Sequence, residues 1–128
     1  MRTILLIILF FFTITPNVFG CPSCDGDEIE VSGVVIKETF PGPPNYKSIE
    51  NGDKPETYWF ILLEDSICFS PDDEFLSEEV VINKLQLVQS NYNFIEGKKY
   101  IIKGITFPRH TGHHHSAVLL EVKSIQEL

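Results

Sequence analysis

The sequence predicts a small, mainly β protein, a five-stranded barrel of the OB-fold type with one short helix. Five runs rich in β-branched and aromatic residues follow one another, separated by segments rich in glycine, proline and asparagine. A candidate helical turn lies between the third and fourth runs, which is the element order of OB-fold barrels. Closing the sheet would also leave so short a β chain without open edges. A small β-sandwich is the alternative.

The first two runs are the most distinctive. Residues 28–39 form the first expected strand because apolar and polar side chains alternate along them, and Gly33 within this run predicts a bulge or a tight bend. Residues 57–64 are apolar on both faces, so this second strand must be covered on both sides. Residues 67–69 are expected to continue it after a turn.

A short helix is expected at residues 91–96. Ser90 or Asn91 can cap its start, and Gly97 suits the left-handed residue that ends many helices. The remaining expected strands cover residues 80–89, 98–107 and 116–125.

The first twenty residues predict a secretory signal peptide. Arg2 precedes an uncharged apolar run at residues 4–14, and Val18 and Gly20 fit the small positions before a cleavage site. A retained membrane anchor is the alternative, but the run is shorter than the roughly 20 residues that span a bilayer. The expected organisation is therefore a signal peptide at 1–20, a polar tether at 21–27 and one barrel domain at 28–128.

The charge balance excludes one class of partner. The 128-residue chain has 18 acidic and 10 basic residues, a formal net charge of −8. Proteins that bind nucleic acid gain affinity from basic contacts to phosphate, so no nucleic-acid partner is expected.

Three cysteines follow the predicted cleavage site. Cys21 would be the first residue of the mature chain, and the residues before it resemble a bacterial lipobox, which predicts lipidation of Cys21. Cys24 and Cys68 would then remain as a pair, and they would form a disulfide in the oxidising compartment that an exported chain reaches. Without a lipid, Cys21 and Cys24 could instead bridge locally and leave Cys68 alone.

Two motifs resemble a known family. Residues 41–46 read Pro-Gly-Pro-Pro-Asn-Tyr, and residues 111–115 read Thr-Gly-His-His-His. Together they are similar to an uncharacterised domain family of small exported bacterial proteins, over residues 31–122. The resemblance implies an envelope protein with one compact domain. The family has no assigned catalytic mechanism, so the resemblance implies no functional residue.

All four histidines lie within six residues. In an extended segment, His113 and His115 would project to the same side, and His110 could reach them from the preceding turn. Imidazoles so placed could hold Zn²⁺, Cu²⁺ or Ni²⁺. The alternative is a polar loop in which a histidine fixes the backbone by hydrogen bonding.

The proline-rich segment at residues 40–56 is the second candidate site. Its prolines stiffen the chain, so that aromatic side chains could be presented to a ligand at low entropic cost. The alternative is that the aromatic rings only pack over one end of the barrel. The candidate ligand-binding residues are Phe40, Pro43, Pro44, Asn45 and Tyr46.

Motifs for enzymatic chemistry are missing from the sequence. It contains no Gly-x-Ser-x-Gly elbow and no glycine-rich phosphate loop. We therefore expect a non-enzymatic binding or interaction module of the bacterial envelope: periplasmic, secreted, or anchored to the outer membrane through a lipid on Cys21. The expected partner is an envelope protein or a small periplasmic ligand. A metal-binding protein or metal-dependent enzyme that uses residues 110–115 is the alternative.

Overall fold

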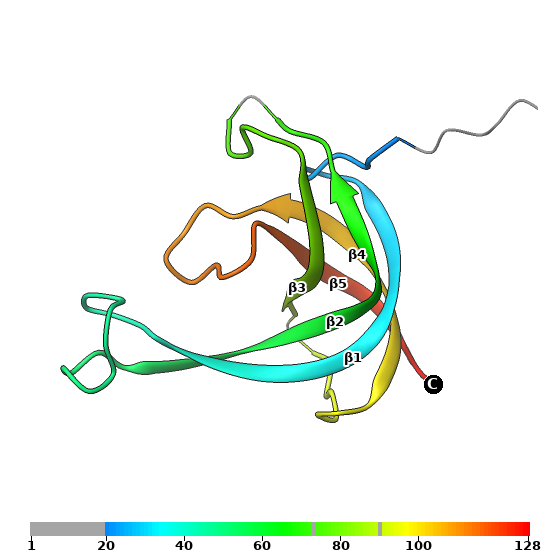
Figure 1. The fold of residues 1–128 in the computed structure, drawn as a ribbon. Helices are drawn as coiled ribbons and strands as arrows, with labels where there is room; N and C mark the ends of the chain where they lie inside the picture. The colour runs from blue at the N-terminus through cyan, green and yellow to red at the C-terminus, as the bar shows by residue number, and fades with distance from the viewer. Residues whose placement is uncertain (1–19, 73, 90) are drawn as a thin grey trace, which may run out of the picture.

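A computed structural model describes residues 20–72, 74–89 and 91–128 (Figure 1). Residues 1–19 of the predicted signal peptide therefore lie outside the described residues. Within the described part of the chain, no helix is long and apolar enough to cross a membrane.

The five strands close into a barrel. Neighbouring strands follow the order β1-β2-β3-β5-β4, and β4 pairs back to β1. Every pairing is antiparallel except that of β3 with β5, which is parallel. This confirms the predicted five-stranded OB-fold-like barrel. The strands are β1 (Glu28–Pro41), β2 (Pro55–Phe69), β3 (Val80–Val88), β4 (Lys99–Pro108) and β5 (Val118–Glu127).

The first strand closes the barrel because it serves two neighbours. Its first half pairs with β4 and its second half with β2, and the strand curves around the barrel between them (Figure 1). Gly33 lies at the changeover, opposite both Leu63 and Tyr100. A Cβ atom on Gly33 would lie 1.9 Å from the carbonyl oxygen of Leu62, so only glycine allows this approach.

The barrel interior is filled by alternating side chains from all five strands. Aliphatic residues dominate it, and Tyr100, Phe69 and Phe94 are the aromatic side chains of the main buried cluster. Trp59 packs edge-on against Phe94 at the margin of this cluster, with ring centroids 5.6 Å apart. The apolar pattern of β2 therefore reflects a strand with side chains buried on both faces, since Phe60 on the outer face is also fully buried.

The helix predicted at residues 91–96 is wrong, because the described residues of this connection form turns and irregular backbone. Phe94 is buried against Tyr100, and the backbone N–H of Ile95 donates to the Tyr100 hydroxyl at 2.9 Å. Gly97 has the expected positive φ, at 82°, but its N–H donates to a carbonyl of β1. Tertiary partners thus take the bonds that a helix would make within itself.

The segment expected to be a tether is instead attached to the barrel. Residues 21–27 run beside the end of β2, where Ser23 forms an isolated parallel bridge with Ser70. Further along, the N–H of Gly26 donates to the Thr106 carbonyl at 2.8 Å, and the N–H of Thr106 donates to the Asp27 carbonyl at 2.9 Å. Backbone hydrogen bonds therefore fix this segment on both sides.

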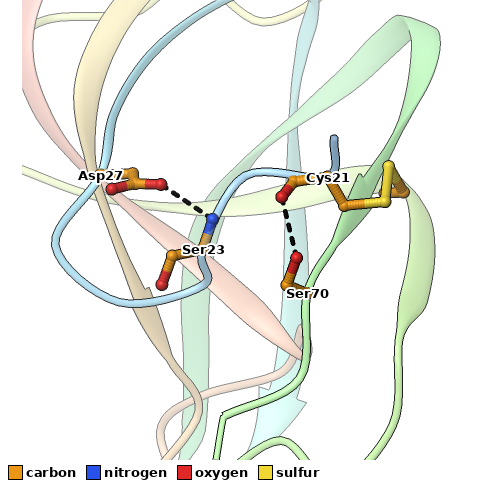
Figure 2. Close-up of a disulfide and its surroundings, with 5 residues drawn as sticks. Cys21, Ser23, Asp27 and Ser70 are labelled. Carbon is orange, nitrogen blue, oxygen red and sulfur yellow. Dashed lines mark hydrogen bonds between the residues drawn. A yellow bond between two sulfur atoms is a disulfide. The ribbon is translucent and has the colours of Figure 1, made fainter. Parts of the chain in front are cut away.

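The disulfide joins Cys21 to Cys68, so the predicted pairing of Cys24 with Cys68 is wrong, as is the local alternative (Figure 2). The Ser70 hydroxyl donates to the Cys21 carbonyl at 2.8 Å and holds that residue beside the end of β2. A sulfur that bridges Cys68 cannot also carry a thioether-linked lipid, so the disulfide is incompatible with lipidation of Cys21.

Cys24 is a buried free thiol. It has no exposed surface, and its sulfur lies 2.8 Å from a carboxylate oxygen of Asp72. Burial, reinforced by this carboxylate, raises the pKa of the Cys24 thiol to about 12. The spacing of the cysteines could not show which of them remains free, because the placement of residues 21–24 beside the end of β2 decides which sulfur faces Cys68.

Candidate functional site

Two loops that the sequence singled out meet beside the barrel. The proline loop, residues 42–54, connects β1 to β2, and the histidine loop, residues 109–117, connects β4 to β5. Figure 1 shows both loops reaching out on the same side of the molecule, the proline loop in cyan-green and the histidine loop in orange. The candidate residues of the two loops therefore belong to one site.

A buried carboxylate organises the proline loop. Asp53 is 4% exposed and accepts hydrogen bonds from the backbone N–H groups of Asn45, Lys47 and Ser48 at 2.8–2.9 Å. These bonds hold the pKa of the Asp53 carboxyl below its usual range, because they favour the charged form. Between these residues, Tyr46 has a positive φ of 55° and directs its ring toward Gly112 of the histidine loop.

The histidine loop is held by Gln86, a buried amide on β3. Its Nε2 donates to the His113 carbonyl at 2.9 Å, and its Oε1 accepts from the His115 N–H at 2.6 Å. Ser116 adds a second connection: its hydroxyl accepts from the Gln86 N–H at 3.0 Å and donates to the Val118 carbonyl at 2.6 Å. The loop backbone is therefore fixed to the barrel at several adjacent residues.

His113 links the two loops. Its Nδ1 lies 2.7 Å from a carboxylate oxygen of Glu56, and its Nε2 lies 3.4 Å from the Tyr46 hydroxyl. Tyr58 donates a hydrogen bond to the same Glu56 oxygen. The bond from Tyr58, followed by that from His113, lowers the pKa of the Glu56 carboxyl. Burial, together with the neighbouring carboxylate, raises the pKa of the Tyr58 phenol.

His115 lies beneath this polar group and packs as an aromatic ring. It stacks on Phe40, with ring centroids 3.8 Å apart and an interplanar angle of 3°. Tyr58 covers it from the side at 5.4 Å. Burial lowers the pKa of the His115 imidazole, which favours its neutral form.

The five candidate residues of the proline segment have different surroundings. Phe40 is the penultimate residue of β1 and packs against Phe60 and His115, as the packing alternative expected. Tyr46 is 40% exposed at the junction of the loops. Pro43 is half-buried, and Pro44 and Asn45 are exposed near the tip. Tyr46 is therefore the candidate that faces both solvent and the other loop.

The structure does not bring His110, His113 and His115 to a common point. His110 packs instead against His114, with ring centroids 4.6 Å apart, while His113 turns to Glu56 and His115 to Phe40. Among the described residues, no group of three or more His, Cys, Asp or Glu side chains is arranged to hold a metal ion. The loop is folded rather than extended, which removes the geometry assumed from the sequence.

A groove of about 380 Å³ opens next to the histidine loop, between β2 and β3. Gln89 belongs to its wall, and the side-chain Oε1 of this residue is buried without a hydrogen-bond partner among the described residues. The lining residues are Thr57, Tyr58, Trp59, Gln86, Leu87, Val88, Gln89, His113 and His114.

Sequence reasoning missed several residues of this site. The sequence places Glu56 at the end of the proline-rich segment and Tyr58 in the apolar second strand, and nothing in their spacing connects them with a histidine more than fifty residues away. Gln86 carried a usable signal, because a lone amide between Leu85 and Leu87 must find hydrogen-bond partners when its strand is buried.

Comparison with known proteins gives one match. Residues 79–126 match the model of a family described as a domain of unknown function (DUF4431). This supports the resemblance to an uncharacterised domain family over β3, β4, β5 and the histidine loop. The proline loop and the cysteines lie outside the matched residues. No curated protein and no solved structure matches the chain.

Proposed function

We propose that this protein is a non-enzymatic interaction module of the bacterial envelope, which recognises its partner at the joined proline and histidine loops. The carrying observation is the contact of His113 with Glu56 and Tyr46, which unites the two loops into one surface. Loops held on a closed barrel are a common arrangement for recognition, because the scaffold fixes their positions before binding.

The surface has the composition of a recognition site. Tyr46 offers an exposed aromatic ring next to the half-exposed imidazole of His113. Aromatic side chains with one polar end are enriched at binding interfaces, since they bury much area and lose little entropy. The partner is another envelope polypeptide or a small ligand of that compartment.

Two features support an address outside the cytosol. The Cys21–Cys68 disulfide is typical of proteins in oxidising compartments. The apolar leader at residues 4–14 is typical of exported chains.

Site-specific photo-crosslinking tests the proposal. Benzoylphenylalanine at position 46 in cells that produce the protein should give a discrete adduct. The same group in place of Ile95, which is 52% exposed on the connection between β3 and β4, is the matched control and should give none. The adduct at position 46 should disappear in the Gln86→Leu background, which releases the histidine loop. The proposed function would be refuted if no adduct forms at position 46, or if positions 46 and 95 give the same adducts.

A further inference from the structure

The groove exists because β2 and β3 separate before either strand ends. Their pairing on this side stops at Phe60 opposite Gln86. From there β2 continues back to Pro55 and β3 continues on to Val88. Figure 1 shows β2 running on toward the proline loop beyond the point where β3 ends. Residues 57–59 and 87–89 therefore face each other across the groove without belonging to one ladder.

Each of these strand segments already has a partner on its other side. Tyr58 is paired with Glu38 of β1, and Leu87 is paired with Leu120 of β5. The edge of each segment that faces the groove is thus a second, open edge. Open edges present backbone N–H and C=O groups in the spacing that an added strand would match.

We propose that this groove binds an extended, uncharged segment of a partner polypeptide, which inserts as a short strand between β2 and β3. This inference rests on the proposed function and names the partner class for it. The groove spans residues 57–59 of β2 and, opposite them, Leu87 and Val88 of β3 with Gln89 just beyond its end. Three residues correspond to about 10 Å of extended chain, or three residues of the partner.

The buried side-chain oxygen of Gln89 points to the same ligand chemistry. Its buried Oε1 is an acceptor without a donor among the described residues. Buried polar atoms are rarely left unpaired, because they lose their hydrogen bonds to water on burial. A backbone N–H of an inserted segment would supply the missing donor.

The lining determines the charge of the segment. None of the nine lining residues is Asp, Glu, Lys or Arg. An ionised side chain entering the groove would lose hydration and find no Asp, Glu, Lys or Arg among the lining residues to compensate for it, whereas an uncharged segment has no charge to desolvate. Tyr58 and Trp59 offer apolar surface to its side chains.

The probe is a pool of acetylated, amidated pentapeptides built from uncharged residues, titrated into the full chain. Amide NMR signals should shift at residues 57–59 and 87–89, and hydrogen exchange of these amides should slow at least tenfold at saturation. A second pool, methylated at alternate backbone nitrogens, should bind at least tenfold more weakly, since it lacks the N–H groups that pair with strands.

Two variants sharpen the result. Gln89→Leu should weaken binding of the first pool by about threefold to tenfold, the value of one hydrogen bond. Gln126→Leu, an exposed amide on β5, is the matched control and should leave binding unchanged. If Gln89→Leu does not fold, Thr57→Trp, which fills the groove from an exposed position, should abolish binding.

Several results would overturn the inference. The first is that the unmethylated peptides cause no shift of the amide NMR signals, or that the methylated peptides bind equally well. The second is that the shifted signals belong to residues outside the groove. The third is that chitotriose shifts the signals of the groove residues and the peptides do not. If any of these occurs while the position-46 adduct persists, the peptide class is wrong and the interaction module stands. If neither the position-46 adduct nor the amide shifts at the groove are observed, both proposals are refuted.

Discussion

The N-terminal segment and the loop site are both attached to the same barrel, but by different kinds of bond. Residues 21–27 are held by a disulfide (Figure 2), and also by backbone hydrogen bonds and by the buried Cys24. The proline and histidine loops touch each other through half-exposed side chains, chiefly His113 and Tyr46. The first arrangement resists local opening, whereas the contact between the two loops depends on side chains that are partly exposed to water.

The largest expected effect is at the N-terminal segment. The double variant Cys21→Ser/Cys68→Ser should lower the free energy of unfolding by about 2–4 kcal/mol, because it frees a 47-residue loop in the unfolded chain. Urea unfolding measures this change. Ser70→Ala, which removes only the hydroxyl bonded to the Cys21 carbonyl, should cost about 1 kcal/mol or less. If the two variants lose the same free energy of unfolding, the disulfide contributes no more to stability than this one hydrogen bond.

The next effect separates the two regions. Gln86→Leu leaves the His113 carbonyl and the His115 N–H without their barrel partner, so we expect a loss of about 1–3 kcal/mol and faster amide exchange across residues 109–117. Exchange at Gly26 should stay unchanged, since its bond to the Thr106 carbonyl involves neither Gln86 nor the histidine loop. Hydrogen exchange measured by NMR checks both statements. Faster exchange at Gly26 would show that the two regions open together.

A smaller effect concerns acid. The lowered pKa of Asp53 means that folding stabilises its charged form. This contribution to the free energy of unfolding is complete above the pKa of the carboxyl in the unfolded chain, about 3.9. It is lost as the pH falls through the lower pKa of the folded protein. Asp53→Asn should therefore reduce stability at pH 6 and have less effect at pH 3, as measured by urea midpoints. Asp65→Asn, at an exposed position of β2, is the control and should behave like the unchanged protein. If Asp53→Asn lowers the stability equally at both pH values, Asp53 acts through its size and hydrogen bonds rather than through its charge.

The different bonding of the two regions also explains what the sequence could predict. Strand periodicity and the glycine at position 33 encode the barrel locally, so all five strands and the closing bend are visible in the pattern. The helix at residues 91–96 was mispredicted because Phe94 and Tyr100 supply tertiary partners that outweigh local capping signals. Cysteine pairing and the contact of Glu56 with His113 depend on how distant strands are placed beside each other, which no local spacing records.

The smallest expected effect is at the contact between the loops. His113→Ala removes a half-exposed side-chain contact with Glu56, and such surface contacts contribute about 1 kcal/mol or less, so the free energy of unfolding should barely change. Amide exchange at the tip of the proline loop should remain slow, because Asp53 holds that backbone independently. Only the Tyr46 side chain should respond, through its ring proton shifts.

His110→Ala is the matched control for this last variant. The imidazole of His110 packs against His114 and Phe107, within the histidine loop and β4. Its removal should therefore leave the ring proton signals of Tyr46 unchanged. If His113→Ala instead destabilises the proline loop as much as Asp53→Asn does, the contact between the loops is part of the fold. The loop surface would then be as rigid as the N-terminal segment, and a partner would bind it without rearrangement.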